Sequence, residues 1–276
     1  MRQVEPIREF SQYPSLVAMQ ASSKVSDRYT FIPTQRIIDV LNKQGWQVSK
    51  IQEKRSRKDE LRGFGEHIVR FRREADFGIQ AIVGEHVPEI VLTGSHDGTA
   101  AWQIMFGLWR FVCGNGAVVA ENEYASHRIL HKGYQDQNVI DAVYEVVETA
   151  PRVLDRVKDW QQLQLTGPEQ IAFAESAIVA KYGSDDANKY NPSRLIQPVR
   201  YADTINREYV NSNSLWNVYN IAQEKLVEKG GRFAVNNAEY RRTTLKKARG
   251  IQNVGENIRV NQSLWMLADK MAKLKE

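Results

Sequence analysis

The spacing of apolar residues changes near the middle of the chain. In the first half, apolar and polar positions alternate, as between 67 and 73, where Val69 and Phe71 interleave with Arg70 and Arg72. A period of two is typical of strands that bury one face. The alternation predicts strands over about 46–55, 67–73, 88–95 and 99–106.

A helix is expected before the first strand. Pro33 and Thr34 begin it, with Thr34 as the N-cap, and Gly45 ends it. Its apolar face is formed by Ile37, Ile38 and Leu41. Between the last two strands, Asp97-Gly98 predicts a tight hairpin turn, because both residues tolerate positive φ angles.

From Asp136 onward the apolar period lengthens to three and four, which is typical of amphipathic helices. Pro151 interrupts the first of these helices, Gly167-Pro168 begins another, and Gly183 stops it. Further helices are expected over about 206–228 and 264–271, with a linker over 184–203.

These patterns predict an α+β protein with an antiparallel sheet in its N-terminal half and a mainly helical C-terminal half. We expect an N-terminal arm over 1–30, a sheet region over 31–135 and a helical region over 136–276. The helical region should pack on the sheet, so that both form one globular unit.

Composition narrows the class of protein. Hydrophobic residues make up 42% of the 276 residues, enough for a sizeable core. No signal peptide and no run of about 18 apolar residues is visible, so we expect a cytoplasmic protein of a bacterial cell without membrane contact. The single cysteine, Cys113, excludes an internal disulfide and is expected to be a small buried residue. Phosphate-binding glycine loops are also absent from the sequence, so no nucleotide cofactor is expected.

Charge gives the main functional indication. The net charge is +5, and the basic residues cluster. Residues 50–73 contain nine Lys or Arg with acidic residues interleaved among them. Residues 229–249 contain seven Lys or Arg and a single acidic residue, Glu239. Such clusters either form solvated surfaces or contact phosphates. The candidate nucleic-acid-binding residues are Arg70, Arg72, Arg73, Arg232, Tyr240, Arg241, Arg242, Lys246 and Lys247, with Tyr240 available to stack on bases.

A metal site has weaker support. His127 and His131 are four residues apart, as two ligands on one helix face would be, and Glu121, Glu123 and Asp136 are near in sequence. Nothing in the sequence fixes their geometry, and a structural or surface role accounts for them as well. We therefore expect no metal, no cofactor and no assigned catalytic residue.

Short motifs resemble a known family. They are Ser-His-Asp-Gly at 95–98, Arg-Phe-Val-Cys-Gly-Asn-Gly at 110–116, Asn-Ser-Leu-Trp-Asn-Val-Tyr-Asn at 213–220, and Asn-x-x-Leu-Trp-x-Leu-Ala at 261–268. In this order they resemble a phage/plasmid-like family known as domain of unknown function 932, over residues 25–272. Gly114 departs from the family pattern, where Ser or Thr is commoner. The resemblance implies no activity, so it assigns no catalytic residue; it favours a mobile genetic element as the setting.

Our leading hypothesis is a non-enzymatic protein that binds or anneals single-stranded DNA in replication or recombination of a phage or plasmid, and that assembles as a homo-oligomer. The first alternative is a protein-interaction factor that blocks or modulates a host defence system. The second alternative is a metal-dependent nuclease that uses His127 and His131.

Overall fold

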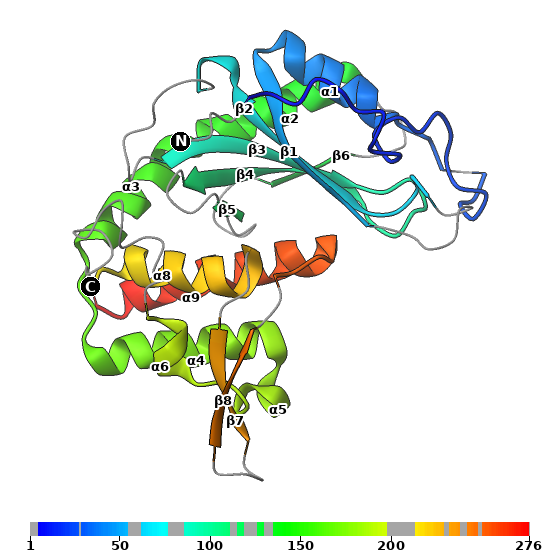
Figure 1. The fold of residues 1–276 in the computed structure, drawn as a ribbon. Helices are drawn as coiled ribbons and strands as arrows, with labels where there is room; N and C mark the ends of the chain where they lie inside the picture. The colour runs from blue at the N-terminus through cyan, green and yellow to red at the C-terminus, as the bar shows by residue number, and fades with distance from the viewer. Residues whose placement is uncertain are drawn as a thin grey trace.

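The structure is a computed structural model. It describes residues 5–27, 29–54, 62–76, 86–110, 115–118, 126–129, 135–197, 213–228, 232–237, 242–247 and 250–275. The sheet lies at one end of the molecule, with a layer of helices beside it and a small hairpin beyond those helices (Figure 1). No helix in the described ranges is long and apolar enough to cross a membrane.

A six-stranded antiparallel sheet forms the first half. Its strands are β1 (Trp46–Glu53), β2 (His67–Arg73), β3 (His86–Gly94), β4 (Trp102–Arg110), β5 (Asn115–Val118) and β6 (Ser126–Ile129). The first five follow one another in space, and β6 also pairs with β4. Since β5 pairs with 107–110 and β6 with 102–105, two short strands share the same edge of β4.

Helices account for most of the second half. They are α2 (Asp136–Glu148), α3 (Ala150–Gln162), α4 (Gly167–Tyr182), α5 (Ser184–Ala187), α6 (Pro192–Leu195), α8 (Leu215–Gln223) with a π-helical extension (Glu224–Glu228), and α9 (Val254–Lys273). The two-stranded hairpin of β7 (Arg232–Asn237) and β8 (Arg242–Lys247) projects past α4 and α6 (Figure 1). The α+β prediction is therefore confirmed.

Alternation along the strands separates two faces of the sheet. One face carries Val69 and Phe71 and is covered by α1 (Thr34–Lys43) and α2 (Figure 1). The opposite face carries Ile68 and Val91, which pack against Val254 at the start of α9. Because both faces are covered, polar residues can be buried on either of them, whereas Arg73 at the end of β2 stays exposed.

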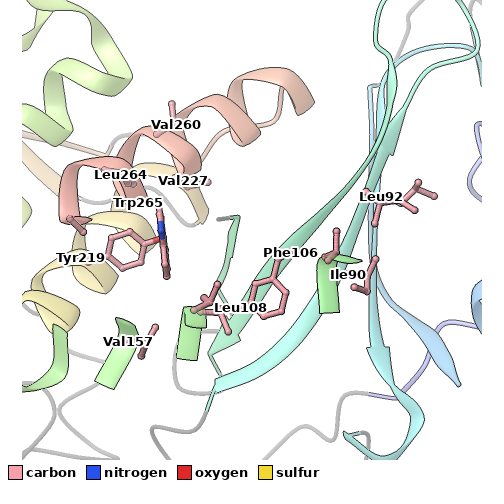
Figure 2. Close-up of a cluster of buried hydrophobic side chains, with 14 of the residues drawn as sticks. Ile90, Leu92, Phe106, Leu108, Val157, Tyr219, Val227, Val260, Leu264 and Trp265 are labelled. Atoms are coloured by element: carbon pink, nitrogen blue, oxygen red, sulfur yellow. The ribbon is translucent and has the colours of Figure 1, made fainter. Parts of the chain in front are cut away.

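One hydrophobic cluster joins the sheet to the helices. It runs from Ile90 and Phe106 on the strands through Leu108 to Tyr219 on α8 and Trp265 on α9 (Figure 2). The aromatic rings interlock: the Trp160 ring of α3 lies 4.6 Å from Trp265 and 5.9 Å from Tyr219, between ring centroids. Both halves of the chain thus share a core.

Breaks between elements follow the local chemistry of Pro and Gly. Pro151 lies in the first turn of α3, where its missing N–H costs nothing, and separates α3 from α2 as predicted. Gly183 ends α4 with a φ of +79°, and Gly45 follows α1 with a φ of +82°, both in the left-handed region.

Three local predictions are wrong. Pro33, not Thr34, occupies the N-cap of α1, because the Thr34 hydroxyl is engaged with two histidines. The strand after Asp97-Gly98 begins at Trp102 rather than 99, since residues 95–101 form a longer loop in which Asp97 accepts bonds from Thr99. Two short helices, α5 and α6, interrupt the linker expected over 184–203.

The N-terminal arm has no helix or strand over 5–27, as expected, but it is attached to the sheet. Ile7 N donates to the carbonyl of Val48 at 2.8 Å, and Leu16 is buried in the core. Cys113 lies outside the described residues, whereas Asn115 and Gly116 begin β5.

Candidate nucleic-acid interface

Arg70 and Arg72 do not form an exposed basic surface. Glu89 of β3 lies between them: its two carboxylate oxygens accept from Arg70 Nη1 at 2.9 Å and Arg72 Nε at 2.8 Å. Both arginines are only 3% exposed. The sequence pattern placed them on the face opposite Val69 correctly, but that face is covered by the helical half rather than by solvent. Their role here is to neutralise a buried carboxylate.

Arg73, the last residue of β2, is exposed. Its guanidinium lies 5.3 Å from the centroid of the Trp46 ring, the residue directly opposite in β1. A cation over an aromatic face is a weak stabilising contact that leaves the charge at the surface. Arg73 therefore stays a candidate phosphate contact.

The second basic cluster lies on the projecting hairpin. Register pairs Arg232 with Lys247, Phe233 with Lys246, and Asn237 with Arg242. Two cationic positions directly opposite each other are unfavourable in an antiparallel ladder unless an anion or solvent offsets them. Tyr240 and Arg241 lie outside the described residues. Sequence reasoning found the charge of this segment but did not predict the hairpin.

A polar groove of about 1070 Å³ lies elsewhere, where three distant segments meet. Three parts of the chain line this groove: the arm, the end of β1 with the segment that precedes β2, and the residues before α9. The lining residues are Gln12, Tyr13, Pro14, Ile51, Gln52, Glu53, Lys54, Arg62, Gly63, Gln252 and Asn253. Lys54 and Arg62 are exposed cations of the first basic cluster. Tyr13 contributes an aromatic ring, and the Gln and Asn residues contribute amides.

The walls of this groove are held by specific contacts. Gln52 Nε2 donates to the carbonyl of Gln252 at 3.0 Å, which ties β1 to the segment before α9. Glu53 accepts from both the N–H and the hydroxyl of Ser15, at 3.2 and 2.6 Å, which ties β1 to the arm. Gly63 has a φ of +80°, and a Cβ there would lie 2.8 Å from the carbonyl oxygen of Pro14, so this wall needs glycine. Sequence reasoning missed the groove, because its sides come from residues up to 241 positions apart, between 12 and 253.

Two buried histidines form a separate network beneath the arm. His67 of β2 and His96 each place Nε2 3.0 Å from the Thr34 hydroxyl, and His96 Nε2 is 2.9 Å from the carbonyl of Ser15. His67 Nδ1 is 3.2 Å from the carbonyl of Gly65, which only accepts, so Nδ1 carries the proton and Nε2 is an acceptor; the Thr34 hydroxyl lies 3.0 Å from this Nε2 and 3.1 Å from the carbonyl of Ser15. The network joins the arm, α1 and the sheet.

The pKa of His67 is lowered to about 3, first because burial penalises its charged form and then because His96 lies beside it. The His67 ring therefore stays neutral across ordinary pH, and it packs edge-on against the Trp102 ring. Both features suit a structural role.

The proposed metal ligands are not brought together among the described residues. His127 belongs to strand β6 rather than to a helix, so the spacing of four does not give one helix face. Asp136 forms an ion pair with Arg36 at 2.8 Å. His131, Glu121 and Glu123 lie outside the described residues, and within the described ranges no group of three or more His, Cys, Asp or Glu is placed to hold a metal.

The fold and site define an α+β protein in which a covered antiparallel sheet supports a polar groove that Lys54 and Arg62 help to line. The chain belongs to the family described as "Domain of unknown function (DUF932)", which matches residues 21–265. It is 34% identical over 262 residues to two proteins of Escherichia coli strain K12, "UPF0380 protein YfjQ" and "UPF0380 protein YafZ". Each alignment covers 95% of this chain and 89% of the relative. No solved structure matches the chain.

Proposed function

We propose that this protein binds single-stranded DNA through the β7–β8 hairpin. The observation that carries the proposal is the concentration of cations along this part of the chain: residues 229–249 hold seven Lys or Arg and one acid, and four of the seven lie on β7 and β8. Each phosphate that a cation neutralises releases condensed counterions, which gives affinity that falls with salt. The order of family-like motifs favours replication or recombination of a phage or plasmid as the setting.

A single strand is favoured over a duplex by the residue types present. The hairpin sequence interleaves Phe233 and Tyr240 with its cations, and aromatic rings stack on unpaired bases. The hairpin is short, with six residues in each strand, so one protomer covers few nucleotides. Assembly of several protomers along one strand would supply the affinity, which is why we propose a homo-oligomer as the binding form.

The test is filter binding of the purified protein to single-stranded DNA at about 50 and about 200 mM salt. The variant Arg241→Ala/Arg242→Ala/Lys246→Ala/Lys247→Ala should bind more weakly at both concentrations. Its plot of log affinity against log salt should also be shallower, by roughly 0.7 for each phosphate that the variant no longer neutralises.

A charge-matched control separates this site from the effect of net charge. The variant Lys24→Ala/Lys43→Ala/Arg152→Ala/Lys270→Ala removes the same number of cations, each of them exposed, from positions scattered over the arm, α1, α3 and α9. It should keep most of the affinity and the salt slope. Absence of retention of wild-type protein at the lower salt would refute the proposal, as would an equal decrease of affinity in both variants.

A further inference from the structure

We infer that the polar groove between the arm and the start of α9 is a second nucleic-acid site, one that holds a nucleotide of a single strand with its base on Tyr13 and its phosphate between Lys54 and Arg62. This inference rests on the proposed function, because it names a contact for the same ligand on a different surface.

The size and openness of the groove suit an extended chain. Its volume of about 1070 Å³ is at the upper end of small-molecule pockets, so it has room for a nucleotide and part of its neighbours. Its lining comes from separate segments of the chain, namely the arm, the end of β1 with the segment that precedes β2, and the residues before α9.

The charge of the lining favours an anion. Lys54 and Arg62 are among its lining residues, and the carboxylate in the same lining, Glu53, is already bonded to Ser15. Both cations are exposed, so a phosphate reaches them without rearrangement of the core. Such cations contribute salt-dependent affinity that does not depend on base sequence.

The remaining lining provides contacts for a base. Tyr13 packs partly against the hydrophobic core, and its backbone is fixed by bonds to Phe10 and Leu16 at 2.8 and 2.9 Å. A ring held in this way is preorganised for stacking, since little side-chain freedom is lost on binding. The amides of Gln12 and Asn253 provide donors and acceptors of the kind that pair with base edges.

Photo-crosslinking locates the bound strand. A single-stranded oligodeoxythymidine with 5-iodouracil substituted for thymine is irradiated with the full-length protein, and adducts are mapped by mass spectrometry. We expect an adduct on the peptide that contains Tyr13. Adducts confined to the hairpin would contradict the groove as a binding site but would leave the proposed function intact. Failure of the wild-type protein to bind the oligonucleotide would contradict both the groove site and the proposed function.

Affinity measurements with matched variants give a second readout. Tyr13→Ala should weaken binding about 5- to 150-fold, the cost of removing the ring on which one base stacks, whereas Tyr13→Phe should bind like wild type. Lys54→Ala/Arg62→Ala should make the salt plot shallower by about 0.7, which corresponds to one fewer neutralised phosphate on a single strand. Lys43→Ala/Arg152→Ala is the charge-matched control and should leave the slope unchanged. Unaltered binding by both the alanine variant of Tyr13 and the double cation variant refutes the inference.

Discussion

His67 makes stability depend on pH at the scale of a single residue. Its imidazole is buried against Thr34 and Trp102, and its pKa in the fold is about 3, against 6.5 for an unperturbed ring. Between pH 6.5 and pH 3 the His67 ring is protonated in the unfolded chain but stays neutral in the folded protein. Unfolding is therefore increasingly favoured as the pH falls from 6.5 towards 3, and the contribution of this group is constant above 6.5.

We predict that wild-type protein loses roughly 1.6 kcal/mol of unfolding free energy between pH 6.5 and pH 5 through His67, with a slope that approaches about 1.4 kcal/mol per pH unit below pH 6. His67→Gln should show a shallower pH dependence in urea denaturation, whatever its stability at neutral pH. Thr34→Ala is the control: it removes the hydroxyl partner but leaves the ring buried, so the steep dependence should remain. An identical pH slope in wild type and His67→Gln would contradict the assignment.

At the scale of elements, the contact between β3 and β4 depends on Gly94. A Cβ added to Gly94 would lie 2.5 Å from a ring carbon of Trp102, which begins the next strand and is fully buried. The Trp102 ring also touches His67 and His96, so it has no room to move away. The absence of a side chain at Gly94 is what lets the two strands bring this indole into the core.

We therefore predict that Gly94→Ala lowers the unfolding free energy by about 1–3 kcal/mol, the usual cost of overpacking a core. Gly167→Ala is the matched control, since nothing lies within 4 Å of an added Cβ there and its φ is not in the left-handed region. It should change stability by less than about 1 kcal/mol. Thermal denaturation of both variants measures the difference, and equal midpoints would show that Trp102 relaxes.

Elements could be predicted from the sequence wherever their signals are local. The alternation around Val69, Pro151 between two helices and Gly183 at a helix end each act within a few residues, and each is confirmed. Long-range packing leaves no such signal. Alternation put Arg70 opposite Val69, but only the fold shows that α9 and its neighbours cover that face and that Glu89 neutralises the charge there.

The groove could not be predicted from the sequence for the same reason. Lys54 and Arg62 were visible as part of a basic cluster, yet Tyr13 and Asn253 became their neighbours only through the packing of the arm and α9 on the end of β1. The hairpin was missed for a different reason: its many charges mask the weak alternation of two six-residue strands.

At the scale of the whole molecule, the hydrophobic cluster is continuous from the sheet to the helices. Leu108 lies between Phe106 on the same strand and the aromatic residues Tyr219 and Trp265 (Figure 2). The groove depends on the same continuity, because one of its walls precedes α9 while another belongs to the arm and β1. A chain whose halves separated easily would lose this site.

We predict that the two halves unfold together. Leu108→Ala should lower the unfolding free energy by about 2–4 kcal/mol, because it opens a cavity in the core that both halves share. Urea transitions followed by far-ultraviolet circular dichroism, which is dominated by the helices, and by tryptophan fluorescence should coincide in the wild type and shift by the same amount in the variant. Met266→Ala, which truncates a side chain that is 39% exposed on α9, is the control and should leave the midpoint nearly unchanged. Because tryptophans lie on both the strands and the helices, fluorescence and dichroism transitions with different midpoints would show that the chain does not unfold as one cooperative unit, and the prediction would be wrong.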